Sequence, residues 1–564
     1  MKNKSLFLIV LFCISCTTEE MVTGKNGMVV STSAQASQVG IEILKQGGNA
    51  VDAAAAVGFT LAVTSSSNGN LGGGGFMVSR MANGKTFTLD YREMAPKSAY
   101  KDLFLDSSKN IIEGKSTGTH YASGVPGSVD GLLRAWGDHG SGKISIKQLL
   151  GPAIDYAKNG FALSKYEAER FNNRKKFLSK HPETRKIFTR NDRKWKSGDV
   201  FYQKDLAATL ERIVENGRNG FYRGKTAELI VSEMKNVSNW MTLEDLDNYT
   251  SKYRKPVVGK FNGLEIISMG PPSSGGILLV MMLNMFTSFG EINNTDIFDL
   301  EFNSSDYIHL ITEIERRAYA DRATHLGDED FWKVPSELLL SDMYAKERVQ
   351  NISIDKSTAS DNIKAGISPF SESEETTHYS VIDKYGNAVS VTTTINSGYG
   401  SGITVTGAGF ILNNEMDDFS SKPGVPNMFG LIGNEANAIE AYKRPLSSMT
   451  PTLVIKDDEP YLILGTPGGS TIITTVLQNI LNVVVHKMNI KEAVDAPRFH
   501  SQWLPDQIDY EKNSLSKRTA NKLKLLGHKL DQRGYIGEAN GVMIDNGMYI
   551  GGADRRGENT AVGY

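Results

Sequence analysis

The stretch Glu375-Thr376-Thr377-His378-Tyr379-Ser380-Val381-Ile382-Asp383 is the part of the sequence around which the rest is organised. It follows a polar, turn-prone segment, 352–375, and continues into a strand-like run from Tyr379 to Asp383. Turn residues at 384–387 lead to a second run, 388–396, which is rich in Val and Thr. Short β-branched runs on either side of a Gly-Asn turn predict a β-hairpin.

A threonine at the start of this hairpin suggests a particular chemistry. A Thr hydroxyl is a weak nucleophile until a base takes its proton. If the bond between Glu375 and Thr376 is cut, Thr376 gains a free α-amine, whose reference pKa of about 7.7–8 leaves neutral amine available near pH 7. Nucleophile and base then share one residue. The alternative is an ordinary strand start, because β-branched residues favour strands in any case.

The composition is that of a globular chain with a large core. Of 564 residues, 40% are hydrophobic and 22% are charged. The net charge of −2 gives no reason to expect a nucleic-acid partner. Both cysteines, Cys13 and Cys16, lie near the N-terminus, so the body from Thr17 onward can form no disulfide and no Cys-ligated metal site. The nine histidines show no metal-binding spacing, and we expect neither metal nor cofactor.

The N-terminus has the pattern of an export signal. Two lysines precede an apolar run, Leu6 to Ile14, that is too short to span a bilayer. A small residue then precedes Cys16, which resembles a bacterial lipoprotein processing site. This pattern predicts a lipid-anchored protein of the periplasm or cell envelope, with Cys16 as its modified first residue. The alternative is an ordinary exported protein cut nearby. No other apolar run reaches the roughly 20 residues that a membrane helix needs.

Three glycine-rich turns allow a functional or a purely structural interpretation. The segment 68–78 contains four consecutive glycines, which indicate a close backbone approach or positive φ angles, beside an active site or in a tight turn. The turn 270–276 either lines a site or only opens a helix. Gly468 and Gly469 stand between a predicted strand and a helix, where N–H groups can bind an anion or an oxyanion, or where the chain simply turns.

Polar residues elsewhere leave similar alternatives open. Arg92 ends a strand-like run and can contact a carboxylate, although most such arginines are surface charges. The acids of 415–418 form either a solvated loop or a site for a cation such as an α-ammonium group. Ser447 and Ser448 offer hydroxyl donors before a strand. The polar loop 423–442 is long enough to be a lid.

The rest of the chain predicts a mixture of strands and helices. Further strands are expected at 27–32, 86–92, 257–269, 452–455 and 461–465. Helices are expected from the cap Ser33 to Lys45, at 50–63, 204–216, 224–235, 277–285 and 306–322, and after Ser470.

Taken together, these segments resemble the γ-glutamyltranspeptidase (glutathione hydrolase) family. The resemblance spans 27–564 and rests on GGNAVDAAAA, NLGGGGFM, DYREMAP, GPPSSGG, TTHYSVID, NNEMDDFSSKPGVPNMFG, KRPLSSMTPT, GTPGGSTIITT and APRFHSQWLPD, in the family's order. It implies an α/β protein with the N-terminal-nucleophile hydrolase fold, a four-layer αββα sandwich. After a signal segment, 1–16, the precursor is expected to cut itself into a large subunit, 17–375, and a small catalytic subunit, 376–564, which stay together as one intertwined globule.

The resemblance also implies a role for each motif residue. In catalysis, Thr376 is the nucleophile, Thr394 orients its hydroxyl, and the N–H groups of Gly468 and Gly469 form the oxyanion hole. The substrate's α-ammonium is bound by Asn396, Glu415 and Asp418, and its α-carboxylate by Arg92, Ser447 and Ser448.

The implied reaction is cleavage of the γ-glutamyl amide of glutathione and related compounds through a γ-glutamyl-Thr ester, with water, an amino acid or a peptide as acceptor. One rival is a glutaryl or cephalosporin-type acylase of the same fold, against which the ammonium-binding acids argue. Another is a non-catalytic lipoprotein that binds γ-glutamyl peptides, against which the intact Thr376 and Thr394 argue. Two departures from the family stand out: the run Ser65–Ser67, expected to be peripheral, and Phe429 on the lid loop where Tyr is frequent.

Overall fold

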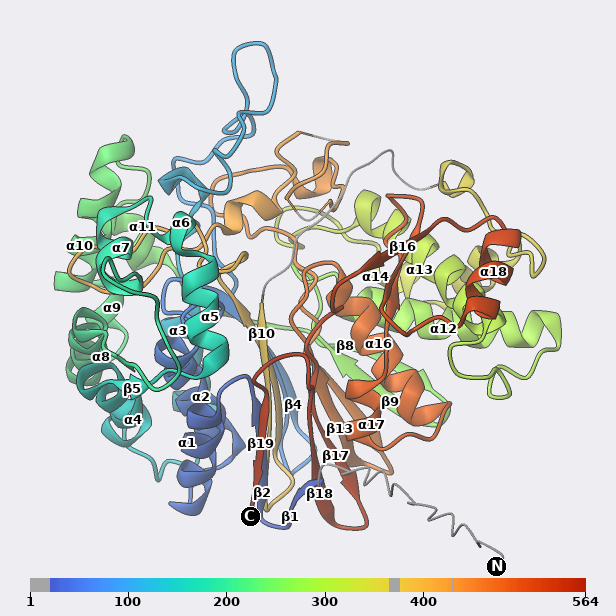
Figure 1. The fold of residues 1–564 in the computed structure, drawn as a ribbon, viewed down its shortest axis with the longest axis horizontal. Helices are drawn as coiled ribbons and strands as arrows, with labels where there is room; N and C mark the ends of the chain where they lie inside the picture. Colours follow the sequence, from blue (N-terminus) through green and yellow to red (C-terminus); the bar gives the residue numbers. More distant parts are fainter. Residues whose placement is uncertain (1–20, 365–375, 423, 429) are drawn as a thin grey trace, which may run out of the picture.

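Two seven-stranded sheets stacked face to face, with helices on both outer faces, form the molecule (Figure 1). The computed structural model describes residues 21–364, 376–422, 424–428 and 430–564. The signal segment, both cysteines, Glu375 and Phe429 lie outside the described residues. The expected four-layer αββα sandwich is confirmed.

The first sheet contains the predicted hairpin at its centre. Its two strands pair antiparallel, with Thr377 opposite Thr393. Strands from both sides of the expected cleavage point are interleaved in this sheet, with β2 between β19 and β10, so the two expected subunits are intertwined. The order is β19 (Thr560–Gly563), β2 (Gly27–Ser31), β10 (Thr377–Asp383), β11 (Ala388–Thr394), β3 (Gly74–Arg80), β4 (Thr86–Asp90) and β7 (Lys252–Arg254).

The second sheet corrects one expectation. The run 257–269, expected as one strand, is a hairpin, because the chain turns at Asn262 and Gly263, whose φ angles are 49° and 77°. The order is β1 (Val22–Gly24), β18 (Met548–Ala553), β17 (Asn540–Asp545), β13 (Glu459–Gly465), β12 (Thr452–Lys456), β9 (Leu264–Ser268) and β8 (Val257–Phe261).

The facing sides of the two sheets share an apolar core. Met28, Phe76 and Ile382 from the first sheet meet Leu453 and Val542 from the second, and all five are fully buried or nearly so. Alternate residues of each strand point into this layer, which is the expected consequence of the two-residue repeat of a strand. The layer holds the hairpin rigidly against the second sheet.

Helices α1 (Ala34–Lys45) and α2 (Ala50–Thr64) cover the outer face of the first sheet (Figure 1). The Ser33 side chain caps α1, as expected, and accepts a hydrogen bond from the Ala36 N–H. Every residue of α2 is buried, because its run of alanines lets the helix pack closely on its neighbours. The remaining helices on this side are α3 (Ser128–His139), α4 (Ile146–Asn159), α5 (Lys165–Asn173), α6 (Lys175–Leu178), α7 (Pro182–Phe188), α8 (Lys204–Asn216), α9 (Asn219–Tyr222), α10 (Gly224–Met234) and α11 (Leu243–Asn248).

The outer face of the second sheet is covered by α12 (Gly275–Asn293), α16 (Thr471–Val484) and α17 (Ile490–Asp495). Around them lie α13 (Ser305–His325), α14 (Ser336–Leu339), α15 (Asp342–Val349) and α18 (Lys517–Leu525). Short strands complete the chain: β5 (Phe161–Ala162) pairs with β6 (Val200–Phe201), and β14 (Phe499–His500), β15 (Ile508–Glu511) and β16 (Leu530–Arg533) form a small sheet.

Helix α12 is an exception to the expectation that no apolar run after the signal segment is long enough to span a membrane. Within the described residues, it is the one helix that is long and apolar enough to cross a membrane by length and composition. In the fold, 78% of its apolar window is buried between β8, α13 and α16. Its hydrophobicity is therefore used for packing inside the sandwich.

The four-glycine segment is a close approach of backbones. A Cβ atom on Gly72 would lie 2.0 Å from the Ile411 carbonyl oxygen, and one on Gly73 would lie 2.0 Å from that of Thr394. Neither glycine has a positive φ angle. Of the two explanations offered by the sequence, close approach holds here, and it brings this loop against the end of β11.

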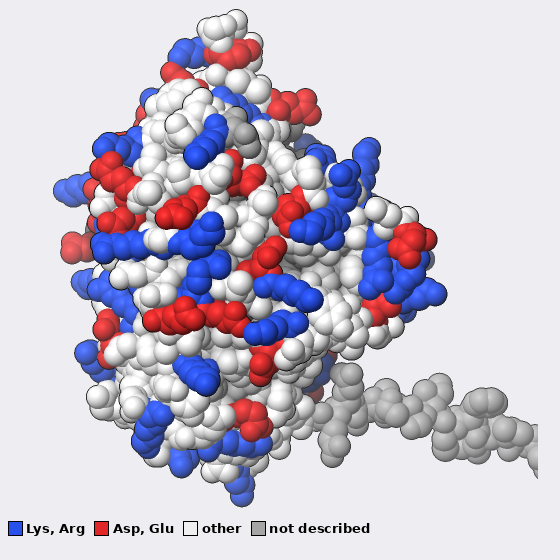
Figure 2. All heavy atoms as spheres, turned by 90° about the vertical axis from the view of Figure 1, so that its left-hand side faces the viewer, with Lys and Arg blue, Asp and Glu red and all other residues white. Residues whose placement is uncertain are grey.

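The outer surface carries a mixture of charges. On the side of the molecule that bears α3 to α11, basic and acidic side chains are interspersed, with apolar and uncharged residues between them (Figure 2). This distribution agrees with the net charge of −2. The notable charges of this protein are instead buried, as described next.

Candidate functional site

Thr376 stands directly before β10, at the centre of the first sheet. Only 5% of its surface is exposed, and its carbonyl oxygen accepts a hydrogen bond from Asn68 Nδ2 at 3.0 Å. Since Thr377 pairs with Thr393, the same register places Thr376 opposite Thr394. Directly opposed residues of an antiparallel pair have their Cβ atoms about 4.5–5.5 Å apart. The hydroxyl of Thr394 is therefore a near neighbour of Thr376, and it accepts a hydrogen bond from the Asn396 N–H at 2.8 Å.

The fold gathers all ten predicted site residues around Thr376. Gly468 lines a second cavity that also contains Thr376. The other nine line a single small cavity: Arg92, Thr376, Thr394, Asn396, Glu415, Asp418, Ser447, Ser448 and Gly469.

A buried ionic cluster forms one wall of this small cavity. The guanidinium of Arg92 makes ion pairs with Glu415 and Asp418, which belong to a short 3₁₀ helix, Glu415–Asp418. Arg92 and Glu415 are each 1% exposed, and the Asp418 side chain is 12% exposed. Arg92 is therefore no surface charge, and the acidic run is no solvated loop. The expected contact of Arg92 with a carboxylate is confirmed, whereas the binding of an α-ammonium group by these acids stays a prediction.

A further acid, Glu93, lies behind this cluster. Its carboxylate is 3.8 Å from Arg92 and fully buried. Burial raises the pKa of Glu93 to about 7, although Arg92 opposes the rise. Burial, together with the nearby Glu93 and Asp418 carboxylates, raises the pKa of Glu415 well above its usual range against the lowering effect of Arg92. Three carboxyl groups around one guanidinium favour the retention of a proton within the cluster.

The serine pair is held from behind by residues that the sequence left unassigned. Arg322, on α13, donates a hydrogen bond to Ser448 Oγ at 3.1 Å and another to Ser274 Oγ at 2.9 Å. Ser274 Oγ in turn donates to the Ser447 carbonyl at 2.7 Å. The turn 270–276 thus supports the serine segment and opens α12. Arg322 itself lines the cavity, so a second buried guanidinium borders it.

Arg322 is the site residue that sequence reasoning missed. It lies in the predicted helix 306–322, where a charged residue is usually on the solvated face. The sequence signal that could have identified Arg322 was the high number of charged residues among the apolar residues of this predicted helix. In the fold, nearly all of α13 is buried, so those charges must find partners inside the protein.

Gly468 and Gly469 connect β13 to α16. Their φ angles are 138° and 53°, both in the region that favours glycine, and a Cβ on Gly468 would lie 2.5 Å from Thr471 Oγ1. Within the described structure, neither amide N–H donates a hydrogen bond. Both glycines border Thr376, Gly469 in one cavity and Gly468 in the other. The arrangement suits the binding of a developing oxyanion.

One group of side chains outside this region has the composition of a metal site. Within the described part of the chain, His309, Glu313 and His528 place their ligand atoms within 4.8 Å of one another. Their atoms are already engaged: His309 Nδ1 is 2.7 Å from His528 Nε2, and Glu313 accepts from Arg317 at 2.8 Å. A second guanidinium, that of Arg316, is 3.3 Å from Glu313. Two nearby cations disfavour a metal ion there, and we interpret the group as a structural hydrogen-bond network.

The cluster predicts a pH dependence of ligand binding. An α-ammonium group needs ionised Glu415, so affinity for L-glutamate should rise as pH increases through the raised pKa of Glu415. Glutarate, which lacks the ammonium, should not show this rise. Glu93→Gln removes a carboxylate that raises the pKa of Glu415, so the rise should move to lower pH. The measurement is the inhibition constant of each compound between pH 5 and 9. An identical profile in wild type and variant would contradict the assignment.

Comparisons with known proteins give a consistent set of relatives. The model of the family described as Gamma-glutamyltranspeptidase matches residues 36–564. The glutathione hydrolase proenzyme of Escherichia coli strain K12 is 45% identical over 547 residues, covering 96% of this chain and 93% of the relative. The proenzyme of the same name from Pseudomonas aeruginosa is 40% identical, covering 99% of this chain and 98% of the relative.

Solved structures agree as well. The crystal structure of Helicobacter pylori gamma-glutamyltranspeptidase is 42% identical with a TM-score of 0.57, and the match covers 59% of this chain and 94% of that one. Cephalosporin acylase from Bacillus halodurans is 24% identical with a TM-score of 0.82, covering 100% of this chain and 99% of that one. The second likeness concerns the fold alone.

Proposed function

The chain belongs to the gamma-glutamyltranspeptidase family, and on this premise we propose that Thr376 is the nucleophile of its reaction. Its fold is the N-terminal-nucleophile hydrolase sandwich, and it is a self-processing γ-glutamyl hydrolase and transpeptidase. The observation that carries the proposal is the convergence of the nine other predicted residues on Thr376, from segments as distant in sequence as Arg92 and Gly469.

The first step is cleavage of the bond between Glu375 and Thr376. It divides the precursor into a large subunit, 17–375, and a small one, 376–564, which stay together because both contribute hydrogen-bonded strands to each sheet. The new α-amine of Thr376 takes the proton of its own hydroxyl. Thr394, opposite in the register, holds that hydroxyl in place.

Substrate binding uses the charged and polar side chains that line the small cavity. Asn396, Glu415 and Asp418 receive the α-ammonium of the γ-glutamyl group. Its α-carboxylate is received by Arg92, Ser447 and Ser448. Gripping both α-substituents places the γ-carbonyl carbon at Thr376 Oγ, which is catalysis by positioning.

The chemical step is acyl transfer. Thr376 Oγ attacks the γ-carbonyl of glutathione or a related compound, and the N–H groups of Gly468 and Gly469 stabilise the oxyanion. The amine leaves with a proton, and a γ-glutamyl ester remains on Thr376. Water, an amino acid or a peptide then takes the acyl group and restores the hydroxyl.

The experiment that tests this proposal is to purify the protein, separate its chains on a denaturing gel and sequence the N-terminus of the smaller one. We expect two bands and a sequence that begins Thr376-Thr377-His378. A start at any other residue, or a single chain that still hydrolyses glutathione, would refute the mechanism.

The rival activity as a glutaryl acylase has less support. A glutaryl group carries no ammonium, so the buried Glu415 and Asp418 would face no cation from such a substrate. Relative rates on γ-glutamyl and glutaryl anilides distinguish the two. The likeness to cephalosporin acylase reflects the shared fold.

We also propose that the protein is exported and anchored through a lipid on Cys16. The support is the sequence of the N-terminal segment, with its lysines, short apolar run and small residue before the cysteine. Cys16→Ser should prevent incorporation of labelled palmitate and release the protein from the membrane fraction. Equal labelling of wild type and variant would refute the anchor.

A further inference from the structure

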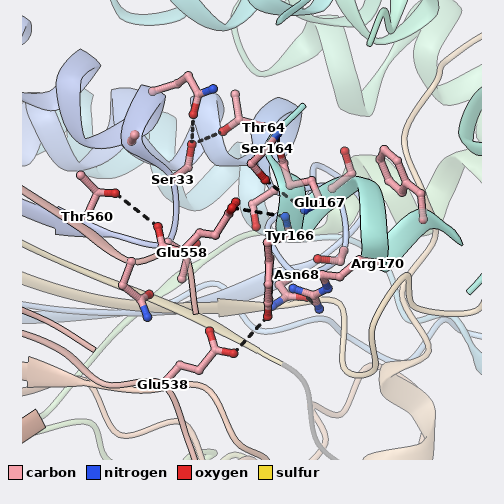
Figure 3. Close-up of a pocket in the computed structure, with 18 of the residues that line it drawn as sticks. Ser33, Thr64, Asn68, Ser164, Tyr166, Glu167, Arg170, Glu538, Glu558 and Thr560 are labelled. Atoms are coloured by element: carbon pink, nitrogen blue, oxygen red, sulfur yellow. Dashed lines mark hydrogen bonds between the residues drawn. The ribbon is translucent and has the colours of Figure 1, made fainter. Parts of the chain in front are cut away.

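Besides the small cavity described above, Thr376 borders a second one. Its lining residues are Asn68, Tyr166, Arg170, Thr376, Pro467, Gly468, Tyr535, Gly537 and Glu538. This second cavity adjoins a larger polar cavity (Figure 3), because Asn68, Tyr166, Arg170 and Glu538 line both. The run Ser65–Ser67, expected to be peripheral, lines the larger cavity. We call these two cavities together the cleft. A ligand in the cleft would approach an ester on Thr376 from outside the small cavity that is proposed to bind the γ-glutamyl group.

Arg170, on α5, has a defined position in this cleft. Its Nη2 donates to Asn68 Oδ1 at 3.2 Å, and Asn68 Nδ2 donates to the Thr376 carbonyl at 3.0 Å. The guanidinium carbon lies 5.3 Å from the centre of the Tyr166 ring. One amide side chain therefore separates Arg170 from Thr376. Such a separation is comparable to the span of two extended residues, roughly 7 Å.

The charges of the cleft favour a ligand carboxylate beside Arg170 and disfavour one beside the acidic residues of the larger cavity. Among the described residues that line the two cavities, Arg170 alone is cationic. Glu538 borders both cavities and accepts a hydrogen bond from the Tyr166 hydroxyl at 3.2 Å. Glu167 and Glu558 line the larger cavity, and burial raises the pKa of Glu167 to about 7, with Glu558 adding to the rise and Arg170 opposing it. The terminal carboxylate of a peptide ligand is thus attracted to Arg170 and repelled by the acidic residues around it.

We propose that Arg170 binds the terminal carboxylate of a dipeptide in this cleft. The dipeptide is either the leaving group of glutathione, cysteinylglycine, or an acceptor of the same length. This inference rests on the proposed function, because it assumes a γ-glutamyl ester on Thr376. It adds the location of the second substrate and the residue that selects it.

The transfer step fits this placement. With its carboxylate at Arg170, the dipeptide points its neutral amine at the ester carbonyl. A C–N bond forms, the C–O bond to Thr376 Oγ breaks, and one proton of the amine passes by way of the Thr376 α-amine to Oγ. The products are a γ-glutamyl dipeptide and the regenerated threonine hydroxyl.

The test compares glycylglycine with glycylglycinamide, which lacks the negative charge, as acceptors from γ-glutamyl-p-nitroanilide. Wild type should use glycylglycine with a kcat/KM about 10- to 100-fold higher, as expected for one charge-assisted contact. Arg170→Ala should reduce this preference at least about tenfold, mainly through the KM for glycylglycine, and Arg170→Lys should restore part of it. Arg174→Ala, on the residue that follows α5, is the matched control and should keep the wild-type preference.

Either of two results would overturn the inference: a wild-type enzyme that does not distinguish the two acceptors, or an Arg170→Ala enzyme that keeps the wild-type preference. If Arg170→Ala remains uncut, Arg170→Gln takes its place, since an amide there retains a donor for Asn68. Failure of the proposed function has a different signature. In that case, wild type would release no p-nitroaniline from the donor even without an acceptor.

Discussion

Thr376→Ala is expected to give an uncut precursor with no measurable turnover of γ-glutamyl substrates. The substitution removes the only atom proposed to attack, both in the cleavage of the chain and in the reaction with substrate. Loss of a catalytic nucleophile typically lowers kcat by about 10³-fold or more, and here failed processing also withholds the α-amine base. The measurement is a denaturing gel together with release of p-nitroaniline from γ-glutamyl-p-nitroanilide.

The neighbouring threonine provides the control. Thr377 is also buried at the start of β10, but its hydroxyl lies 2.9 Å from Thr32 Oγ1, and it does not line either cavity that contains Thr376. Thr377→Ala should therefore be cut and active, whereas Thr376→Ser should be cut more slowly than wild type. Normal cleavage of Thr376→Ala would show that another group attacks.

Asp418→Asn is expected to lower kcat/KM for γ-glutamyl donors by about 10²-fold or more. A buried charge-assisted hydrogen bond contributes about 1.5–3 kcal/mol, and loss of one partner of a buried pair costs about 3–5 kcal/mol. The fold should tolerate the change, because Arg92 keeps Glu415 and Glu93 as neighbours. Glutaryl donors have no ammonium and should lose much less, so the preference of γ-glutamyl over glutaryl anilide should fall.

Asp417→Asn is the matched control for this prediction. Asp417 is the adjacent acid and is also buried, but its carboxylate accepts the Met428 N–H at 2.8 Å and does not line the small cavity. The donor preference of this variant should equal that of wild type. Equal effects of the two substitutions would mean that the ammonium is not bound at Asp418.

The contrast between these neighbouring acids shows where sequence reasoning stops. The sequence presents 415–418 as a dense acidic run without distinguishing its members by position. A 3₁₀ helix turns Glu415 and Asp418 toward Arg92, whereas Asp417 faces the loop that contains Met428. The direction of each side chain depends on the backbone conformation and on the packing around it. Neither can be predicted from the local amino-acid composition.

The positions of Arg322 and Arg170 likewise depend on tertiary packing, here between segments that are far apart in the sequence. Each lies on a helix, and nothing in the local pattern separates them from the many arginines that face solvent. Arg322 reaches Ser448 across 126 positions of sequence, and Arg170 reaches Asn68 across 102. Only the packing of α13 against the serine segment, and of α5 beside the end of α2, gives these cations their roles.

The sequence by itself determined the hairpin, the strands beside it, the helices that cover the sheets and the motif residues of the site. The hairpin, strands and helices depend on side-chain periodicity, turn residues and capping, which act between neighbours in the chain, whereas the roles of the site residues were implied by the resemblance of the motifs to a known family. The tertiary structure decided which charges are buried together, which glycines touch another backbone and which cavities meet at Thr376. Those properties arise from contacts between distant segments, and they exist only once the two sheets have packed against each other.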